Sequence, residues 1–105
     1  MSVLTIARDA AQKSNMRQKH GAVIYSKHPM TSGFNYRLAI PNDGKFSIHA
    51  EEMVILKALR RGINLRNCSI IVVRIKKDGE FAISKPCKKC TRLIEEMRIK
   101  KVLNT

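Results

Sequence analysis

Two short strings hold the residues of this chain that are best suited to chemistry: His49-Ala50-Glu51 and Pro86-Cys87-Lys88-Lys89-Cys90. His49, Cys87 and Cys90 are of the types that bind zinc, and Glu51 is a carboxylate beyond those ligands. Structural zinc is normally closed by four protein ligands, whereas catalytic zinc keeps three and leaves the fourth place to water. Three ligands with a spare carboxylate therefore predict an open, catalytic zinc site in which Glu51 moves protons.

The first string is expected at the start of a helix. Ser47 is a suitable N-cap for a helix that runs to about Arg61, and Gly62 suits the C-terminal end of that helix. Apolar residues occur nearly all the way round this segment, so most of it is expected to be buried.

The second string is expected to open another helix, with Pro86 in its first turn. Cys87 and Cys90 are three positions apart, so their side chains point to the same side of that helix. The helix dipole and the lysines beside the cysteines favour the thiolate, which is the form that binds metal. We therefore expect two helix N-termini to face each other across a zinc ion.

The remaining pattern predicts helices that alternate with strands. Parallel crossovers are expected in the second half of the chain, so the predicted fold class is a layered α/β sandwich in the order α-β-β-α-β-α-β. The other expected elements are a helix over 3–11, strands over 22–26 and 30–36, a loop over 37–46, a buried central strand over 69–75 and a last strand over 101–105.

Length and composition predict a single domain, 1–105, without a membrane span. The chain has 105 residues, 44% of them hydrophobic, and no apolar run approaches the ~20 residues that a spanning helix needs. No secretory signal is visible at the N-terminus. An odd number of cysteines, two of them in a C-x-x-C unit, favours metal or redox chemistry over disulfides. We expect a soluble protein with no membrane partner, in the cytoplasm.

The charge balance is strongly positive. Lys and Arg number 21 against 8 acidic residues, a formal charge of +13. Such a balance attracts polyanions and phosphorylated ligands, and nucleic acid is a possible partner. A well-solvated basic surface with no such partner explains the same balance.

The two strings together resemble a known signature. H-x-E followed by P-C-x-x-C is typical of zinc-dependent nucleobase deaminases, and the sequence resembles the cytidine and deoxycytidylate deaminase superfamily. The element order, the string Gly33-Phe34-Asn35 and the segment 98–102 lie where that superfamily has similar features. The resemblance covers nearly the whole chain and implies a three-layer cytidine-deaminase-like sandwich.

The resemblance also implies an activity and a role for each site residue. The activity is that of a hydrolase of nucleotide metabolism, which converts a cytosine base in a nucleoside or nucleotide to its uracil counterpart and releases ammonia. His49, Cys87 and Cys90 correspond to the ligands of one Zn²⁺ per chain, and Glu51 to the general acid/base. Asn35 corresponds to a residue that hydrogen-bonds the sugar or base, and the Ala50 N–H to a group that contacts the base carbonyl.

Two departures from the superfamily bear on the substrate and the assembly. The sequence is truncated after the fourth strand, which leaves a sheet edge open, and we therefore expect a homo-oligomer, a dimer or larger. Lys85 precedes Pro86 where tRNA-adenosine deaminases have Glu. The lysines around Cys87 either solvate the helix or hold a phosphate at the rim of the pocket.

Alternative interpretations remain at this stage. The C-x-x-C unit alone also suits a redox pair, or a structural zinc site with a fourth ligand from Cys68, His20 or His28. Two other functions fit the sequence. One is a deaminase of cytosine or adenine in RNA or DNA. The other is a non-catalytic, zinc-stabilised basic domain that binds nucleic acid.

Overall fold

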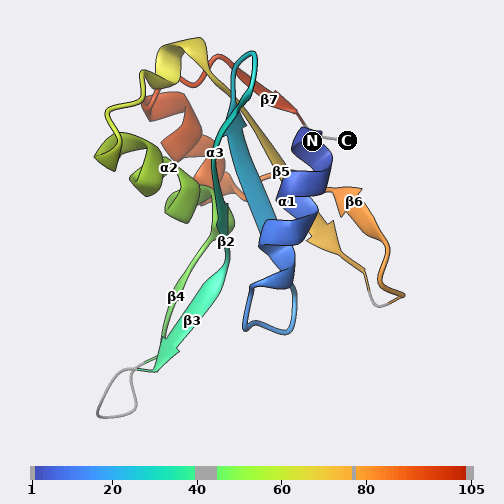
Figure 1. The fold of residues 1–105 in the computed structure, drawn as a ribbon. Coiled ribbons are helices and arrows are strands. Elements are labelled where there is room, and N and C mark those ends of the chain that lie inside the picture. The colour runs from blue at the N-terminus through green and yellow to red at the C-terminus, as the bar shows by residue number, and fades with distance from the viewer. Residues whose placement is uncertain (1, 40–44, 77, 104–105) are drawn as a thin grey trace.

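The computed structural model describes residues 2–39, 45–76 and 78–103 (Figure 1). Its main sheet is mixed, and β5 lies at the centre. The strands of this sheet are β1 (His20–Tyr25), β2 (Pro29–Phe34), β5 (Ser69–Ile75), β6 (Phe81–Ile83) and β7 (Lys101–Leu103). No helix in the described ranges is long and apolar enough to cross a membrane.

The pairing around β5 explains the order of the strands. On one side β5 pairs antiparallel with β1, which in turn pairs antiparallel with β2. On its other side β7 lies parallel to the first half of β5, and β6 lies antiparallel to the second half. Because β7 runs parallel to β5 and α3 (Lys88–Glu96) precedes it in the chain, the crossover predicted for the second half is confirmed.

Helices cover both faces of the sheet, so the predicted three layers are confirmed. Figure 1 shows α1 (Val3–Gln12) on one side and α2 (Ala50–Arg60) with α3 on the other. Successive side chains of β5 alternate between the two faces of the sheet. Ile71 and Val73 pack in the cluster that α1 covers, while Ile70 and Val72 pack in the cluster that α2 and α3 cover.

A second, two-stranded sheet lies where a loop was expected. β3 (Tyr36–Ala39) pairs antiparallel with β4 (Lys45–Ile48), and Figure 1 shows this ribbon extending away from the main sheet. The prediction of a loop over 37–46 is therefore wrong at both ends, while residues 40–44 lie outside the described residues. Asn15 anchors the ribbon, because its amide donates to the Arg37 carbonyl and accepts from the Arg37 N–H, both at 2.8 Å.

The predicted start of α2 is also wrong. Ser47 lies in β4, opposite Arg37, and His49 is the N-cap of a helix that begins at Ala50. The strand pairing extends to Ile48 and so leaves Ser47 no place at the helix end. At the other end the prediction is confirmed, since the helix ends at Arg60 and Gly62 follows with φ 71°.

The helix α3 begins after Pro86, slightly later than predicted. Pro86 does not lie in the first turn, because Cys87 is the N-cap, with an extended backbone (φ −69°, ψ 169°). The Cys87 Sγ accepts a hydrogen bond from the Cys90 N–H at 3.4 Å, the bond expected of a capping side chain. Pro86 therefore stands just before the helix.

Smaller differences concern the strands. β2 ends at Phe34, so the expected strand over 30–36 is divided at Asn35. The short 3-10 helix Leu65–Asn67 and β6 were not predicted. The last strand is confirmed over 101–103, and residues 104–105 lie outside the described part.

Candidate metal centre and active site

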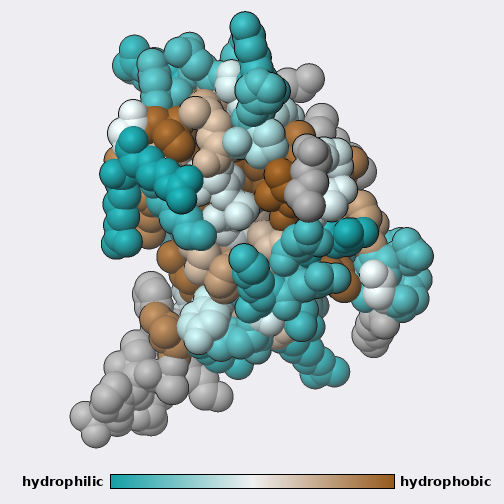
Figure 2. Space-filling view, in the orientation of Figure 1, coloured by the Kyte–Doolittle hydropathy of each residue, from teal (hydrophilic) through white to brown (hydrophobic). Residues whose placement is uncertain are grey.

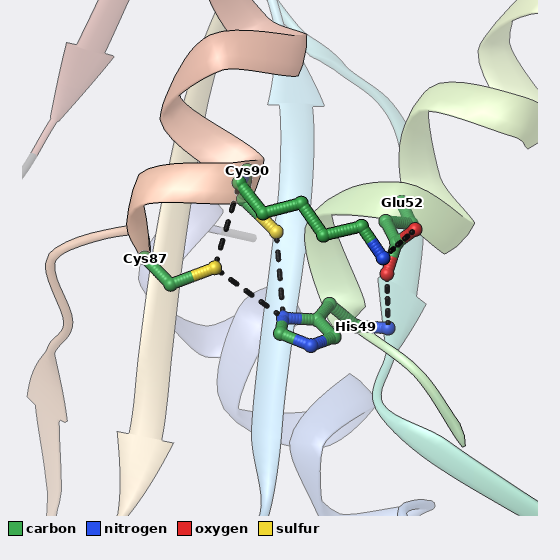
Figure 3. A network of polar contacts seen from close by, with 5 residues as sticks. His49, Glu52, Cys87 and Cys90 are labelled. Atoms are coloured by element: carbon green, nitrogen blue, oxygen red, sulfur yellow. Dashed lines mark hydrogen bonds and ion pairs between the residues drawn. The ribbon is translucent and has the colours of Figure 1, made fainter. Parts of the chain in front are cut away.

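His49, Cys87 and Cys90 meet between the first turns of α2 and α3 (Figure 3). The His49 Nδ1 lies 3.4 Å from the Cys90 Sγ and 3.6 Å from the Cys87 Sγ. The candidate ligand atoms all lie within 4.8 Å of one another. The two helix starts therefore face each other as the sequence predicted.

These separations fit a tetrahedral zinc ion. With Zn–S near 2.3 Å and Zn–N near 2.0–2.1 Å, a tetrahedron places nitrogen and sulfur about 3.6 Å apart. The observed 3.4 Å and 3.6 Å match this value. Within the described ranges no further His, Cys, Asp or Glu joins this group, so the residues present offer three ligands and no fourth.

The three residues named as alternative fourth ligands lie in different settings. Cys68 is buried, and its Sγ contacts the Asn64 carbonyl and the Met30 sulfur. His28 is exposed in the bend between β1 and β2. His20 begins β1 and lies outside the candidate metal group. This placement disfavours a structural zinc site closed by any of them.

Burial distinguishes the two cysteines of the group. Cys87 is exposed, whereas Cys90 is fully buried. Burial raises the pKa of the Cys90 thiol, and the nearby Glu51 carboxylate and the Cys87 thiol raise it further. A cation at this place offsets that cost, because it favours the charged thiolate over the buried thiol.

Glu51 is a buried carboxylate, with 5% of its surface exposed. It lies in the first turn of α2, while His49 is the extended residue just before that helix. Because His49 is not helical, the usual rule that residues two apart point to opposite sides does not apply to this pair. Both residues line the same cavity.

The cavity has a volume of about 260 Å³ and an open mouth. Every site residue that the sequence singled out lines it, except the buried Cys90. Its walls come from the segment before β1, the end of β4 with the start of α2, and the segment that leads to α3. The lining residues are Met16, Gln18, His20, Asn35, Ser47, Ile48, His49, Ala50, Glu51, Val72, Ser84, Lys85 and Cys87.

Asn35 is buried in the cavity wall, and its side chain is held by the backbone of Gln18 and His20. Its Nδ2 donates to the Gln18 carbonyl at 2.7 Å, and its Oδ1 accepts from the His20 N–H at 2.8 Å. The side-chain oxygen is thus engaged by the backbone. A ligand in the cavity is left mainly with the second Nδ2 hydrogen, which lies toward the His20 ring, 3.5 Å away.

His20 was considered from the sequence only as a fourth ligand of a structural zinc site, and its place in the cavity wall was not predicted. Burial lowers the pKa of its imidazole, and the nearby Glu51 carboxylate opposes that shift. The residue type alone gave no signal, because a histidine before a strand is common. The one indication was its place directly before Gly21, at the start of a strand that leads into the core.

Lys85 lies at the cavity as an exposed cation, one residue before Pro86. Of the lysines around Cys87, Lys85 lines the cavity, the position from which a phosphate at the rim would be held. Among the described residues no carboxylate pairs with it, since the ion pairs found there are Arg8–Asp9 and Lys89–Glu52.

Solved structures show which class of fold this is. The apo dCMP deaminase from cyanophage S-TIM5 is 20% identical, with a TM-score of 0.73 over 95% of this chain and 76% of that chain. The cytidine deaminase from Burkholderia pseudomallei is 22% identical, with a TM-score of 0.76 over 100% of this chain and 85% of that chain. The fold is therefore that of cytidine deaminases. No curated protein matches the sequence significantly.

The sequence itself identifies the family. The chain belongs to the family described as the cytidine and deoxycytidylate deaminase zinc-binding region, which matches residues 1–105. The resemblance stated from the two strings is thereby confirmed.

Proposed function

We propose that this protein is a zinc-dependent hydrolase that deaminates a cytosine base in a nucleoside or nucleotide and releases ammonia. The observation that carries this proposal is the wall of the cavity. His49, Cys87 and the buried Glu51 line the same cavity, and the buried Cys90 has its Sγ 3.4 Å from the His49 Nδ1.

His49, Cys87 and Cys90 would hold one zinc ion. When bound, zinc supplies a water whose pKa is lowered toward ~7 and a positive charge that polarises it. The Cys90 N–H donates to the Cys87 Sγ at 3.4 Å, a bond that stabilises a thiolate at the start of α3. Burial opposes charge on Cys90, so the ion itself would have to favour the thiolate there.

Glu51 would carry the protons of the reaction. Its carboxylate would accept one proton from the attacking water and pass it to the ring nitrogen, and would then take the second proton, from the newly added hydroxyl, and give it to the departing amine. In the balanced reaction a C–O bond forms at the ring carbon, the C–N bond to the amine breaks, and ammonia leaves. The buried position of Glu51 in the cavity wall suits a group that must reach substrate without competing bulk water.

Asn35 and Ala50 would orient the substrate. Ala50 is the first residue of α2, so its N–H has no carbonyl one turn earlier in the helix and is available to a base carbonyl. The Asn35 amide retains a donor toward the cavity. A volume of about 260 Å³ suits a small ligand such as a base with part of its sugar.

A mass-based panel tests the proposal. Zinc-loaded protein is incubated with nucleosides, monophosphates and single-stranded oligonucleotides, and each product is read by mass. We expect a +1 Da change in a cytidine compound, with ammonia released, and no change after zinc is removed with a chelator. Absence of conversion in every cytosine and adenine substrate would refute a deaminase activity.

The charge of the chain favours a second candidate, deamination of cytosine or adenine in RNA or DNA. The formal charge is +13, and in the described residues only Arg8 and Lys89 pair with carboxylates. Lys85, exposed at the cavity and outside both ion pairs, remains available to a phosphate. Conversion of the oligonucleotides alone, with binding that weakens steeply as salt rises, would select this candidate.

A further inference from the structure

We propose that Glu52 is a positioning residue of the metal centre, which fixes the backbone of His49 and ties α2 to α3. This inference rests on the proposed zinc site. Glu51 and Glu52 are neighbours in the chain but face different surroundings. Glu51 is buried at the cavity, whereas Glu52 is half-buried and faces α3.

Two contacts of Glu52 support this positioning role (Figure 3). Its Oε1 accepts a hydrogen bond from the His49 backbone N–H at 3.0 Å, and its Oε2 lies 3.4 Å from the Nζ of Lys89. Lys89 directly precedes the ligand Cys90. Among the described residues, this is the one ion pair that joins α2 and α3.

The His49 ring faces the cysteines with the nitrogen nearer to the main chain, so the position of the His49 backbone affects the metal site. That nitrogen is Nδ1, which lies closer to the main chain than Nε2 does. His49 is also the extended N-cap residue between β4 and α2, so its own backbone is outside the helix. A hydrogen bond that fixes its N–H therefore fixes the position of Nδ1 relative to the two sulfur atoms.

The two contacts are unequal in strength. The Lys89 side chain is 72% exposed, and an ion pair in that setting contributes little. The bond from Glu52 to the His49 N–H is charge-assisted, directed and better shielded from water. The hydrogen bond should therefore account for most of the effect on the metal.

Three substitutions separate these contributions. Glu52→Ala removes both contacts, Glu52→Gln keeps an oxygen acceptor for His49 but loses the charge, and Lys89→Met removes the ion pair alone. Loss of a group that holds a metal ligand typically weakens metal affinity by about 10–100-fold. We expect about a 10-fold loss for Glu52→Ala, about a 3-fold loss or less for Glu52→Gln, and a smaller loss for Lys89→Met.

Zinc affinity is measured by competition with a chromogenic chelator, and the visible spectrum of the Co²⁺-substituted protein reports the geometry of the thiolate ligands. Glu96→Ala serves as the control, because Glu96 is an exposed carboxylate of α3 and should leave both readouts unchanged. Thermal melting of the zinc-free proteins shows whether each variant folds.

The outcomes distinguish this inference from the proposed function. A native chain that binds zinc tightly, with Glu52→Ala equal to it in affinity and in Co²⁺ spectrum, would overturn the positioning role and leave the zinc site intact. A loss in Glu52→Ala that Glu52→Gln largely restores supports it. If Glu52→Ala fails to fold, Glu52→Gln decides, since a loss greater than that of Lys89→Met supports the role and an equal or smaller one opposes it. A native chain without zinc affinity would overturn both proposals.

Discussion

In the cavity wall, an acidic side chain lies near an imidazole and near the candidate metal ligands. The buried carboxylate Glu51 shares the wall with the imidazole of His20 and with the candidate ligands His49 and Cys87. Burial disfavours charge on His20, while Glu51 favours it. Because burial is the larger cause, the imidazole is held neutral in the folded protein at neutral pH.

The lowered pKa of His20 predicts how its contribution to stability depends on pH. Below the unfolded value of 6.5 the unfolded chain binds a proton that the folded chain resists, so stability falls as the pH falls through this range. The contribution is present above that value. In zinc-free protein, the native chain should therefore lose more stability than His20→Gln between pH 7 and pH 5. Urea unfolding at several pH values measures this difference, and parallel curves for the two proteins would contradict it.

The packing of α2 against β2 determines where His49 and Glu51 lie. Gly33 of β2 lies directly against α2, and a Cβ built on it would stand 2.9 Å from the Val54 nitrogen and 3.2 Å from the Ala50 carbonyl oxygen. Both are backbone atoms of the helix that holds His49 and Glu51 near its start. The close approach therefore fixes the position of α2 relative to β2, in addition to contributing packing contacts.

Gly33→Ala should push α2 away from the sheet. Overpacking of this kind costs about 1–3 kcal/mol, and zinc affinity should fall as His49 moves. Gly62→Ala is the matched control, because nothing lies within 4 Å of its added methyl group and its φ of 71° alone makes it unfavourable. It should cost about 1 kcal/mol and leave zinc affinity unchanged. A Gly33→Ala protein with native stability and zinc affinity would show that α2 is placed by other contacts.

How far the sequence predicts the elements depends on how local their causes are. α1 and β5 were predicted because apolar spacing is a property of each segment alone. The β3–β4 ribbon was missed, since it depends on pairing between two segments and on the bonds between Asn15 and Arg37, 22 positions apart, rather than on a pattern within one segment. The N-cap of α2 was misplaced for the same reason, because β4 extends through Ser47.

The candidate site was predicted as far as residue types allow. His49, Cys87 and Cys90 have few other uses together, so their meeting could be expected. The place of His20 could not, because it depends on where β1 begins relative to the cavity. The engagement of the Asn35 oxygen by the His20 N–H likewise depends on the neighbouring backbone rather than on sequence.

The molecule as a whole combines a small apolar core with a strongly basic surface. In Figure 2 hydrophilic residues cover most of the visible face, and hydrophobic ones lie in smaller groups between them. With 21 basic and 8 acidic residues, most of that surface repels cations and attracts phosphates. The candidate metal centre lies between two helix starts, and Glu51 lines the cavity beside it.

The central claim, that a three-ligand metal centre works with Glu51 as its proton carrier, is tested most directly by Glu51→Ala. Turnover of the cytosine substrate and bound zinc are measured on the same preparations of the native and variant proteins. We expect zinc content equal to native, since Glu51 is not among the three candidate ligands, and turnover lower by at least about 10²-fold. Full turnover in zinc-loaded Glu51→Ala would contradict the account, and so would loss of zinc from a folded variant.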